Sequence, residues 1–516
     1  MLHRKNVRIL PFLLIWFFTL FALAAVALHP KFMWRTFWGV LIAASTAAGM
    51  AYFWISHTQI SVFDIFAGWN AAHEAGRAAT FYAHETDAAL VLFSITVAVF
   101  AWPTGAYAPA KQEMFKKLSL LPAFPIALMA GMIFLKNGIF YGTLPNQFAP
   151  ISMASLLVGK VALQQAPQRQ HVVWNIDTSK KQQKIVYLVD ESIRYDYIDL
   201  TPGNPFTPQF AKLADKFVDF GPASSAGNCS NYSNALLRFG ASREDVSGSA
   251  NSNPTLFEYA KAAGYRTVYI DAQARALTLG SDMQNFMSLD ERAFVDKFYL
   301  LRDEEVFNAD EALGKIIAEE LKTGKMVFIY ANKNGSHFPY DNSYPKETAL
   351  FHPTMTEANI DSQAARIASY RNGIAWSVDR FMKNLFAETD FDNTTLIYTS
   401  DHGQELDPGH LTHCQADRPD PKMHIVPLMV HTSDPLLFQQ FKHGANLLKY
   451  KASHFQIAPT IYGLMGFAPA DVAKRYDESL LLGTQRTTQT TSGDVFGIFG
   501  GHVNWNAVDL TKNYLE

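Results

Sequence analysis

Four long runs of apolar residues in the first third of the chain limit most strongly how it can fold. They cover residues 9–28, 36–55, 88–102 and 118–134, and the first of them holds no charged side chain. A helix needs about 20 apolar residues to cross a bilayer, so each run predicts a membrane-spanning helix. The first run is too long for a typical signal-peptide core and lacks a small-residue cleavage motif, so we expect an uncleaved span.

Basic residues between the runs indicate how these helices are oriented. Lys31 and Arg35 separate the first two runs, and Lys111, Lys116 and Lys117 separate the last two. The positive-inside rule places both connections in the cytoplasm and the chain that follows the fourth run outside it. The basic amino terminus disagrees, because four spans leave both ends on one side. A fifth span or a re-entrant segment would remove the conflict.

The pattern divides the chain into three parts. We predict a transmembrane helical domain over residues 1–158, a linker rich in Gln and Lys over 159–181, and a catalytic domain over 182–516. Near 57–87 the chain is too polar to cross a membrane but keeps aromatic side chains, as expected of a helix in the membrane interface. Asn70 and Glu74 are one helical turn apart and would share a face. A solvated connecting helix is the alternative.

Charge and cysteine content exclude some functions. The formal net charge is −3, so the chain lacks the basic surface typical of nucleic-acid binding, and we expect no nucleic acid partner.

Cys229 and Cys414 are the two cysteines of the chain, and each lies beside a predicted site residue. Two isolated cysteines carry little information about pairing, and we expect free thiols rather than a bridge.

Beyond the linker, apolar β-branched runs alternate with helical patterns. This alternation is typical of an α/β fold whose mostly parallel sheet is covered by helices on both faces. The predicted strands are 184–189, 265–271, 326–330, 394–400 and 425–431, and the predicted helices are 255–263, 310–322, 364–387 and 454–466.

Three of the predicted strands lead into side chains that bind metals. Glu191 follows one, His337 follows another, and Asp401 with His402 follows a third. The carboxyl ends of parallel strands meet at one edge of a sheet, so we expect a metal centre of carboxylate and imidazole ligands, which suit zinc. Gly403 would let the backbone turn so that both preceding side chains reach one ion. A strand-end loop in which Asp401 caps a helix is the alternative.

A nucleophile and a further imidazole complete the predicted site. His413 and His424 follow the strand at 394–400, and we expect at least one of them to join the metal ligands. Small polar residues at 223–234 lead into an apolar helical pattern, which places Ser230 at the amino end of a helix. The positive potential there, with a bound zinc ion, would lower the pKa of its hydroxyl and let it attack as an alkoxide. The alternative is that Ser230 only caps the helix.

Four segments of the predicted catalytic domain share the motifs of a known family, in the same order. Leu-Val-Asp-Glu-Ser-Ile-Arg at 188–194 is similar to a strand ending in Gly-Glu-Ser-x-Arg, and Gly-Ser-His-Phe-Pro at 335–339 is similar to Gly-Ser-His-Gly-Pro. Ser-Asp-His-Gly at 400–403 matches, and His413 precedes a Val-Pro-hydrophobic strand at 426–428. The chain therefore resembles the membrane-anchored phosphoethanolamine transferases and their sulfatase-like relatives in the alkaline phosphatase superfamily. The resemblance implies an alkaline-phosphatase-like three-layer sandwich preceded by an α-helical transmembrane domain.

The resemblance also implies roles for individual residues, around one zinc ion with room for a second. The catalytic zinc ion would be held by Glu191, Ser230, Asp401 and His402. The phosphoryl group or a second zinc ion would be bound by His337 and His413, and the lipid substrate would be seated by Asn70 and Glu74.

The chain departs from the family in three places. The transferases usually have Cys-Gly-Thr at the nucleophile, where this chain has Asn228, Cys229 and Ser230. We take Ser230 as the nucleophile and Cys229 as the second candidate. The chain lacks the Cys-x-Pro-x-Arg signature that true sulfatases convert to formylglycine, which disfavours sulfate-ester hydrolysis by that route. Asp190 stands where the family often has Gly, and the usual disulfide cysteines are absent.

The resemblance predicts a zinc-dependent, monomeric, multi-pass phosphotransferase of the bacterial inner membrane, with its catalytic domain in the periplasm. Ser230 would take phosphoethanolamine, or a related headgroup, from a phospholipid donor such as phosphatidylethanolamine. A surface glycolipid, such as lipid A or the lipopolysaccharide core, would then accept the group. One alternative is a sulfatase-like phosphodiesterase that passes the group to water. The other is a non-catalytic membrane protein that binds lipids or partners.

Overall fold

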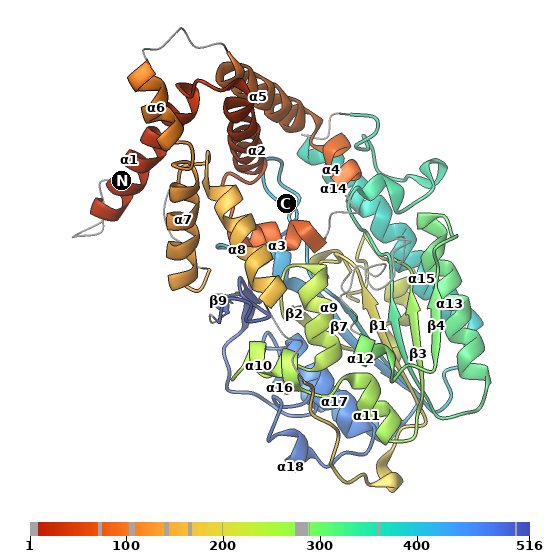
Figure 1. Ribbon diagram of the computed structural model, residues 1–516. Helices are drawn as coiled ribbons and strands as arrows, with labels where there is room; N and C mark the ends of the chain where they lie inside the picture. Colours follow the sequence, from red (N-terminus) through yellow and green to blue (C-terminus); the bar gives the residue numbers. More distant parts are fainter. Residues whose placement is uncertain are drawn as a thin grey trace. The chain divides into compact units, whose positions relative to one another are not determined.

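Two compact units make up the chain, and each is described by itself (Figure 1). The computed structural model describes residues 9–70, 75–102, 109–138, 144–163, 168–198, 200–273, 287, 289–358, 362–500 and 503–515. The first unit comprises Met1–Gln165 with Gly409–Leu411 and Ile498–Gly501, and the second holds the remaining residues.

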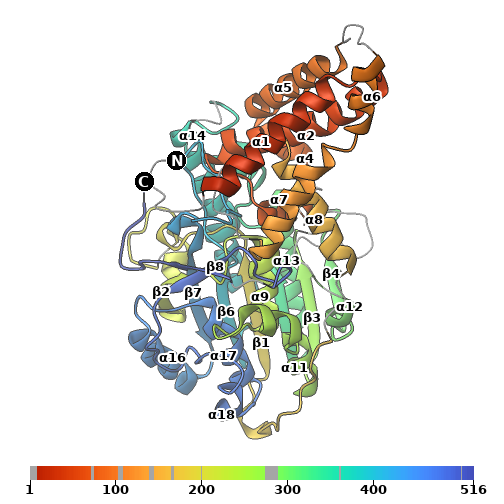
Figure 2. The ribbon, with the colours of Figure 1, turned by 60° about the vertical axis from the view of Figure 1, so that its left-hand side comes forward.

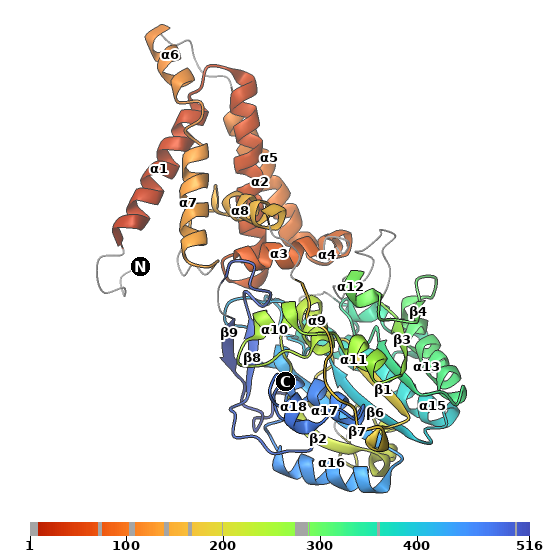
Figure 3. The same ribbon diagram turned by 60° about the horizontal axis from the view of Figure 1, so that its bottom comes forward.

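The first unit is helical. Its helices are α1 (Ile9–Ala27), α2 (Phe32–Ser56), α3 (Val62–Asn70), α4 (Ala75–Phe81), α5 (Ala83–Ala101), α6 (Pro109–Lys117), α7 (Ala123–Leu135) and α8 (Ala149–Leu163). Figure 3 shows α3 and α4 running across the direction of the longer helices α2 and α5, which pack along each other. Each of the four predicted apolar runs is therefore helical over most of its length, and the fourth becomes helical at Ala123.

Two of these helices are long and apolar enough to cross a membrane. They are α2 and α5, whereas α1 and α7 contain shorter apolar segments. The predicted linker is helical at its start, because α8 continues to Leu163. This helix was not predicted from the sequence. Multi-pass insertion remains a prediction.

One residue of the predicted lipid-contacting pair lies at the end of α3. Asn70 is the last residue of this helix, and its side chain lies outside the described part of the structure, as does Glu74. The expected pairing of these residues on one face stays a prediction.

The second unit is built on a seven-stranded sheet with the order β2-β7-β6-β1-β5-β3-β4 (Figure 2). All strands in this sheet run parallel except β7, which is antiparallel to both of its neighbours. The strands are β1 (Lys184–Asp190), β2 (Val218–Ser224), β3 (Arg266–Asp271), β4 (Lys297–Leu300), β5 (Val327–Asn332), β6 (Thr394–Ser400) and β7 (Ile425–Thr432). A separate pair is formed by β8 (Gln489–Ser492) and β9 (Asn504–Ala507). The mostly parallel sheet confirms the predicted fold class.

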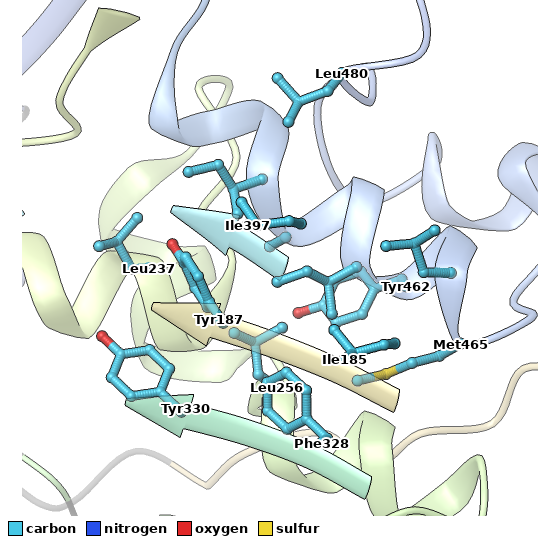
Figure 4. Close-up of a cluster of buried hydrophobic side chains, with 14 of the residues drawn as sticks. Ile185, Tyr187, Leu237, Leu256, Phe328, Tyr330, Ile397, Tyr462, Met465 and Leu480 are labelled. Carbon is cyan, nitrogen blue, oxygen red and sulfur yellow. The ribbon is translucent and has the colours of Figure 1, made fainter. Parts of the chain in front are cut away.

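Helices cover both faces of this sheet, which explains why every residue of β1, β5 and β6 is buried. The helices are α9 (Ser230–Phe239), α10 (Val246–Ser252), α11 (Leu256–Ala262), α12 (Leu289–Arg292), α13 (Val306–Lys322), α14 (Gln363–Ile374), α15 (Phe381–Glu388), α16 (Pro435–Leu447), α17 (Ile457–Leu464) and α18 (Pro469–Val472). Figure 4 shows the core on one face, where Ile185 and Phe328 of the sheet meet Leu256 and Tyr462 of the helices.

The strand register brings the predicted site residues to one edge. Asp190 at the end of β1 pairs with Ser400 at the end of β6, and Val189 pairs with Asn332 at the end of β5. The Asp401 amide donates to the Asp190 carbonyl at 2.9 Å, which extends the ladder by one residue. Three sequence-distant segments therefore leave the sheet side by side.

Gly403 is required for a different reason than the one expected. The φ angle of Gly403 is not in the left-handed region, so the turn after His402 does not depend on left-handed backbone. A Cβ at this position would instead collide with the Lys422 carbonyl and lie 2.9 Å from the Ile425 carbonyl oxygen. The glycine allows the segment before β7 to pass directly against the metal-ligand turn.

A disulfide joins Cys229 to Cys414, so the expectation of free thiols was wrong. Their Cα atoms are 4.4 Å apart although 185 residues separate them in sequence. Beside the bridge, the Cys414 amide donates to the Asn228 carbonyl at 2.6 Å. The pairing depends on how the amino end of α9 meets the segment after β6, and this approach leaves no local signal in the sequence. Cys229 consequently has no free thiol.

Gly403→Ala should destabilise the second unit by about 1–3 kcal/mol, the usual cost of forcing an extra methyl group into a packed interior. Gly463 in α17 is the matched control, because a Cβ there would meet no atom within 4 Å. Gly463→Ala should be neutral or stabilising by up to about 1 kcal/mol, since alanine is the better helix former. Urea unfolding of the two variants measures both values, and equal effects would contradict the steric explanation.

The double variant C229A/C414A should lose about 2–5 kcal/mol of stability, because the bridge closes a long loop in the unfolded chain. Thermal unfolding with and without a thiol reductant measures the effect. The reductant should lower the unfolding temperature of the unaltered protein and leave that of the double variant unchanged. Labelling of the unfolded, unreduced chain by a thiol reagent would show instead that the cysteines are free.

Candidate metal centre

Glu191, Asp401 and His402 form a buried group of ligand-type side chains at the carboxyl edge of the sheet. Glu191 directly follows β1, and the other two directly follow β6. All three are 0% exposed, and one ligand atom from each lies within 4.8 Å of the others. The convergence that parallel strands predicted is therefore present.

Ser230 joins this group from the amino end of α9. Its hydroxyl donates to Glu191 Oε1 at 3.2 Å and lies 3.1 Å from His402 Nε2. Cys229 is the N-cap residue, so Ser230 is the first residue of the helix and lies in the positive potential of its amino end. The small polar residues predicted this helix start. It places the Ser230 hydroxyl beside Glu191 and His402.

The spacing of these atoms fits a small tetrahedral ion. His402 Nε2 lies 3.2 Å from Glu191 Oε1 and 3.6 Å from Asp401 Oδ2. Ligands at about 2.0–2.2 Å from a tetrahedral zinc ion stand roughly 3.3–3.6 Å from one another. Two carboxylate oxygens, one imidazole nitrogen and one hydroxyl oxygen are also a donor set that zinc accepts.

The His402 ring is held with its Nε2 atom toward the cluster. Its Nδ1–H donates to the Gly403 carbonyl at 2.7 Å. A carbonyl oxygen only accepts, so this bond assigns the proton to Nδ1 and leaves Nε2 as the ligand nitrogen. Metal-binding histidines usually have such a partner on the other ring nitrogen.

The electrostatics of the cluster favour positive charge where the ligand atoms meet. Burial raises the pKa of Glu191, but the hydrogen bond and the charge of His402 outweigh burial and leave this pKa below its usual range. Burial lowers the pKa of His402, yet the charges of Asp401 and Glu191 raise it to about 9. Burial and the Glu191 charge raise the pKa of Asp401 well above its usual value. Two carboxylates compete for one cation, which is the situation that a divalent metal relieves.

His337 and His413 lie next to this group. The His413 ring stacks on His402 with a centroid distance of 4.6 Å, and the His337 and His413 centroids are 6.4 Å apart. His337 Nδ1–H donates to the Phe338 carbonyl at 2.7 Å. His424, the other candidate, is buried, and its Nδ1 lies 2.8 Å from Thr490 Oγ1. Of the two candidate histidines, His413 is therefore the one that stacks on His402.

Asp190, which replaces the family's usual Gly, forms a buried ion pair beneath the site. Lys333 Nζ donates to Asp190 Oδ2 at 2.5 Å and to the Ser377 carbonyl at 2.6 Å, and the Tyr398 hydroxyl donates to Asp190 Oδ2 at 2.9 Å. The pair connects the end of β1 to the residue after β5. Removing Lys333 would leave the buried Asp190 without its cation, whereas Lys333 also lies 3.8 Å from Asp310 Oδ2.

Sequence reasoning missed two amide side chains that touch the ligands, Asn234 and Gln273. Asn234 Nδ2 donates to Asp401 Oδ2 at 3.1 Å, and Gln273 Nε2 donates to Glu191 Oε2 at 3.0 Å. Asn234 follows Ser230 by one helical turn and so shares its face, which could have indicated it. Gln273 follows the end of β3, but the position of β3 in the sheet has no signal in the sequence.

Known proteins resemble the chain in sequence over part of its length. A Kdo(2)-lipid A phosphoethanolamine 7''-transferase of Escherichia coli (strain K12) is 30% identical over 160 residues, which are 29% of this chain and 28% of that protein. The enzyme of the same name from Salmonella typhimurium is 30% identical over 156 residues. The match thus spans less than a third of the length of these relatives.

Solved structures match the fold over more of the chain. Integral membrane lipooligosaccharide phosphoethanolamine transferase A from Neisseria meningitidis superposes with a TM-score of 0.61 at 16% identity, over 84% of this chain and 85% of that one. The zinc complex of the C-terminal periplasmic domain of EcEptC from Escherichia coli gives 0.51 at 18% identity, over 64% of this chain and 94% of that domain. These likenesses confirm the alkaline-phosphatase-like fold behind amino-terminal apolar helices.

The family follows from the sequence itself. The family model described as Sulfatase matches residues 183–467, which is more than half of the chain and contains Glu191, Ser230, Asp401 and His402. The resemblance inferred from the motifs is confirmed, and the chain belongs to the sulfatase family.

Proposed function

We propose that this protein transfers phosphoethanolamine from a phospholipid to a surface glycolipid through a covalent intermediate on Ser230. The observation that carries the proposal is the position of the Ser230 hydroxyl, which is within 3.2 Å of both Glu191 Oε1 and His402 Nε2 at the start of α9. The names of the partly matching relatives, which are Kdo(2)-lipid A phosphoethanolamine 7''-transferases, support the substrate class.

Glu191, Asp401, His402 and Ser230 would hold one zinc ion. Their donor atoms and spacing fit the ion, and a similarly folded periplasmic domain has been solved as a zinc complex. When bound, zinc lowers the pKa of a coordinated hydroxyl and offsets charge on phosphoryl oxygens. A second zinc ion near His337 and His413 remains the alternative to direct phosphoryl binding by these rings.

The chain's own residues would perform the transfer in two steps. In the first, Ser230 Oγ forms a bond to phosphorus, and the bond from phosphorus to the diacylglycerol oxygen breaks. His337 and His413 would hydrogen-bond the phosphoryl oxygens, and the proton that leaves Ser230 would end on the diacylglycerol oxygen. In the second, a hydroxyl or phosphate oxygen of the glycolipid attacks the same phosphorus, the bond to Ser230 breaks, and Ser230 Oγ regains a proton from the attacking hydroxyl or from water.

The helical unit would keep the enzyme at its lipid substrates. We place the protein in the bacterial inner membrane as a multi-pass, monomeric protein with the second unit in the periplasm. Asn70 and Glu74 would help to seat the phospholipid headgroup, as the family resemblance implies. The two helices of membrane-spanning length, α2 and α5, support anchoring. The number of spans is part of the proposal.

Hydrolysis is the second candidate, because the family also contains sulfatases. A hydrolase would use the same Ser230 intermediate and pass the group to water instead of a glycolipid. Incubation with phosphatidylethanolamine and lipid A separates the two by mass spectrometry. Modified lipid A supports transfer, whereas free phosphoethanolamine with unmodified lipid A supports hydrolysis.

Ser230→Ala should abolish the covalent intermediate and lower lipid A modification by more than about 1,000-fold, since the variant lacks the oxygen that would form the ester. Intact-mass analysis after incubation with phosphatidylethanolamine vesicles detects the adduct. Ser252→Ala is the matched control, because that hydroxyl only donates to the Gly248 carbonyl within α10. An adduct of undiminished yield on the Ser230 variant would overturn the assignment.

Removal of zinc by a chelator should abolish transfer by the unaltered protein, and added zinc should restore it. Asp401→Asn should weaken zinc binding by more than about 100-fold, because losing a ligand costs more than losing one of its hydrogen bonds. Asp509→Asn is the control, since this exposed carboxylate bonds only to Thr511 in its own turn. Chelator competition measures both affinities, and transfer that persists without metal would contradict a role for zinc.

A further inference from the structure

We propose that Asn234 and Gln273 are positioning residues that hold the two carboxylate ligands in the geometry needed to bind zinc. The inference rests on the metal site proposed above. Each amide donates an N–H group to one carboxylate, and each is anchored in turn by β5 or the residue that follows it. Neither residue belongs to the motifs by which the sequence resembles its family.

Asn234 couples Asp401 to the nucleophile. Its Nδ2 donates to Asp401 Oδ2 at 3.1 Å and to the Ser230 carbonyl at 3.0 Å, and its Oδ1 accepts from the Tyr330 hydroxyl at 3.0 Å. Two acceptors on one side require the NH₂ group there, so the orientation of the amide is determined by its partners. Tyr330 is fully buried near the carboxyl end of β5 (Figure 4).

The oxygen that Asn234 contacts is the one that faces the cluster. Asp401 Oδ2 lies 3.6 Å from His402 Nε2, whereas Oδ1 accepts from the Ser192 and His402 amides at 3.1 and 2.7 Å. Both oxygens are thus held, and the carboxylate cannot rotate without breaking bonds to the segments that follow β1 and β6. Because Asn234 also bonds the Ser230 carbonyl, one side chain relates the nucleophile to this ligand.

Gln273 performs the same task for Glu191. Glu191 Oε1 accepts from Ser192 Oγ at 2.7 Å and faces Ser230, while Oε2 accepts from Gln273 Nε2 at 3.0 Å. The same Nε2 donates to the Lys333 carbonyl at 2.6 Å. The Lys333 side chain is itself fixed by the Asp190 ion pair. Gln273 is therefore anchored to a residue whose side chain is held by Asp190, the residue that stands where the family often has Gly.

The other end of Gln273 indicates that this amide does more than fill space. Gln273 is buried, and within the described part of the chain its Oε1 atom has no hydrogen-bond partner. A buried carbonyl without a partner is unfavourable, so a purely structural role would be served better by an apolar side chain. Donation to Glu191 is the contribution that an apolar side chain cannot make.

Neutral amides suit this role better than cationic donors. An Arg or Lys at either position would neutralise a ligand carboxylate and compete with the metal for it. An amide orients the carboxylate and leaves its charge available. Hydrogen bonds to metal ligands typically change metal affinity by about 10–100-fold when they are removed.

The test uses the full chain in detergent and zinc as the probe. Asn234→Leu and Gln273→Met remove each amide at similar side-chain volume. Both should raise the zinc dissociation constant by about 10–100-fold in chelator competition, and they should alter the visible spectrum of the cobalt-substituted protein. Excess zinc should restore lipid A modification by both variants. Asn253→Ala is the control, since this buried amide donates to the Gly240 carbonyl away from the ligands.

The outcomes separate this inference from the function on which it rests. If the unaltered chain binds no zinc, the proposed metal site fails and the inference fails with it. If the unaltered chain binds zinc and both variants bind it equally well, the inference alone is overturned. Should Asn234→Leu unfold, Tyr330→Phe removes only the hydroxyl that anchors Asn234. An unchanged dissociation constant in Tyr330→Phe and Gln273→Met would likewise overturn the inference, and weaker binding in both would support it.

Discussion

The burial of two carboxyl groups against one imidazole is the constraint on which the site in the second unit depends. Glu191 and Asp401 follow neighbouring strands and share one imidazole, His402, in an interior that excludes water. Two carboxylate charges beside one imidazolium are unfavourable, and burial together with the Glu191 charge raises the pKa of Asp401 well above its usual value. The parallel register brings Glu191 and Asp401 close together, and a cation bound between them would compensate their negative charge. The same arrangement that raises the pKa of Asp401 would therefore suit a divalent ion.

Much of this site can be predicted from sequence because its signals are local. A β-branched run that stops at Asp401 and His402 marks a strand end, and small polar residues before an apolar helical pattern mark the start of α9 at Ser230. Parallel topology then requires such ends to meet. The agreement for Glu191 has the same origin, so one rule of sheet geometry accounts for three residues.

What could not be predicted depends on how separate segments approach one another. The disulfide between Cys229 and Cys414, the space that Gly403 leaves for the Lys422 carbonyl and the contact of Gln273 with Glu191 each join distant parts of the chain. Strands β2 and β4 were missed for a related reason. β2 contains Gly221 and Pro222, β4 has four residues, and neither shows the buried β-branched run of a central strand.

The disulfide also bears on the choice of nucleophile. By sequence alone Cys229 and Ser230 compete, since they are adjacent and either side chain can form a phosphoryl ester. In the bridged state Cys229 has no thiol, and its backbone carbonyl accepts from the Ser233 amide at 2.9 Å as the N-cap of α9. The bridge thereby fixes the helix start next to the segment that carries His413, which favours the oxygen nucleophile that the family resemblance implies. Disulfides persist in oxidising compartments, which agrees with the periplasmic location proposed for this unit.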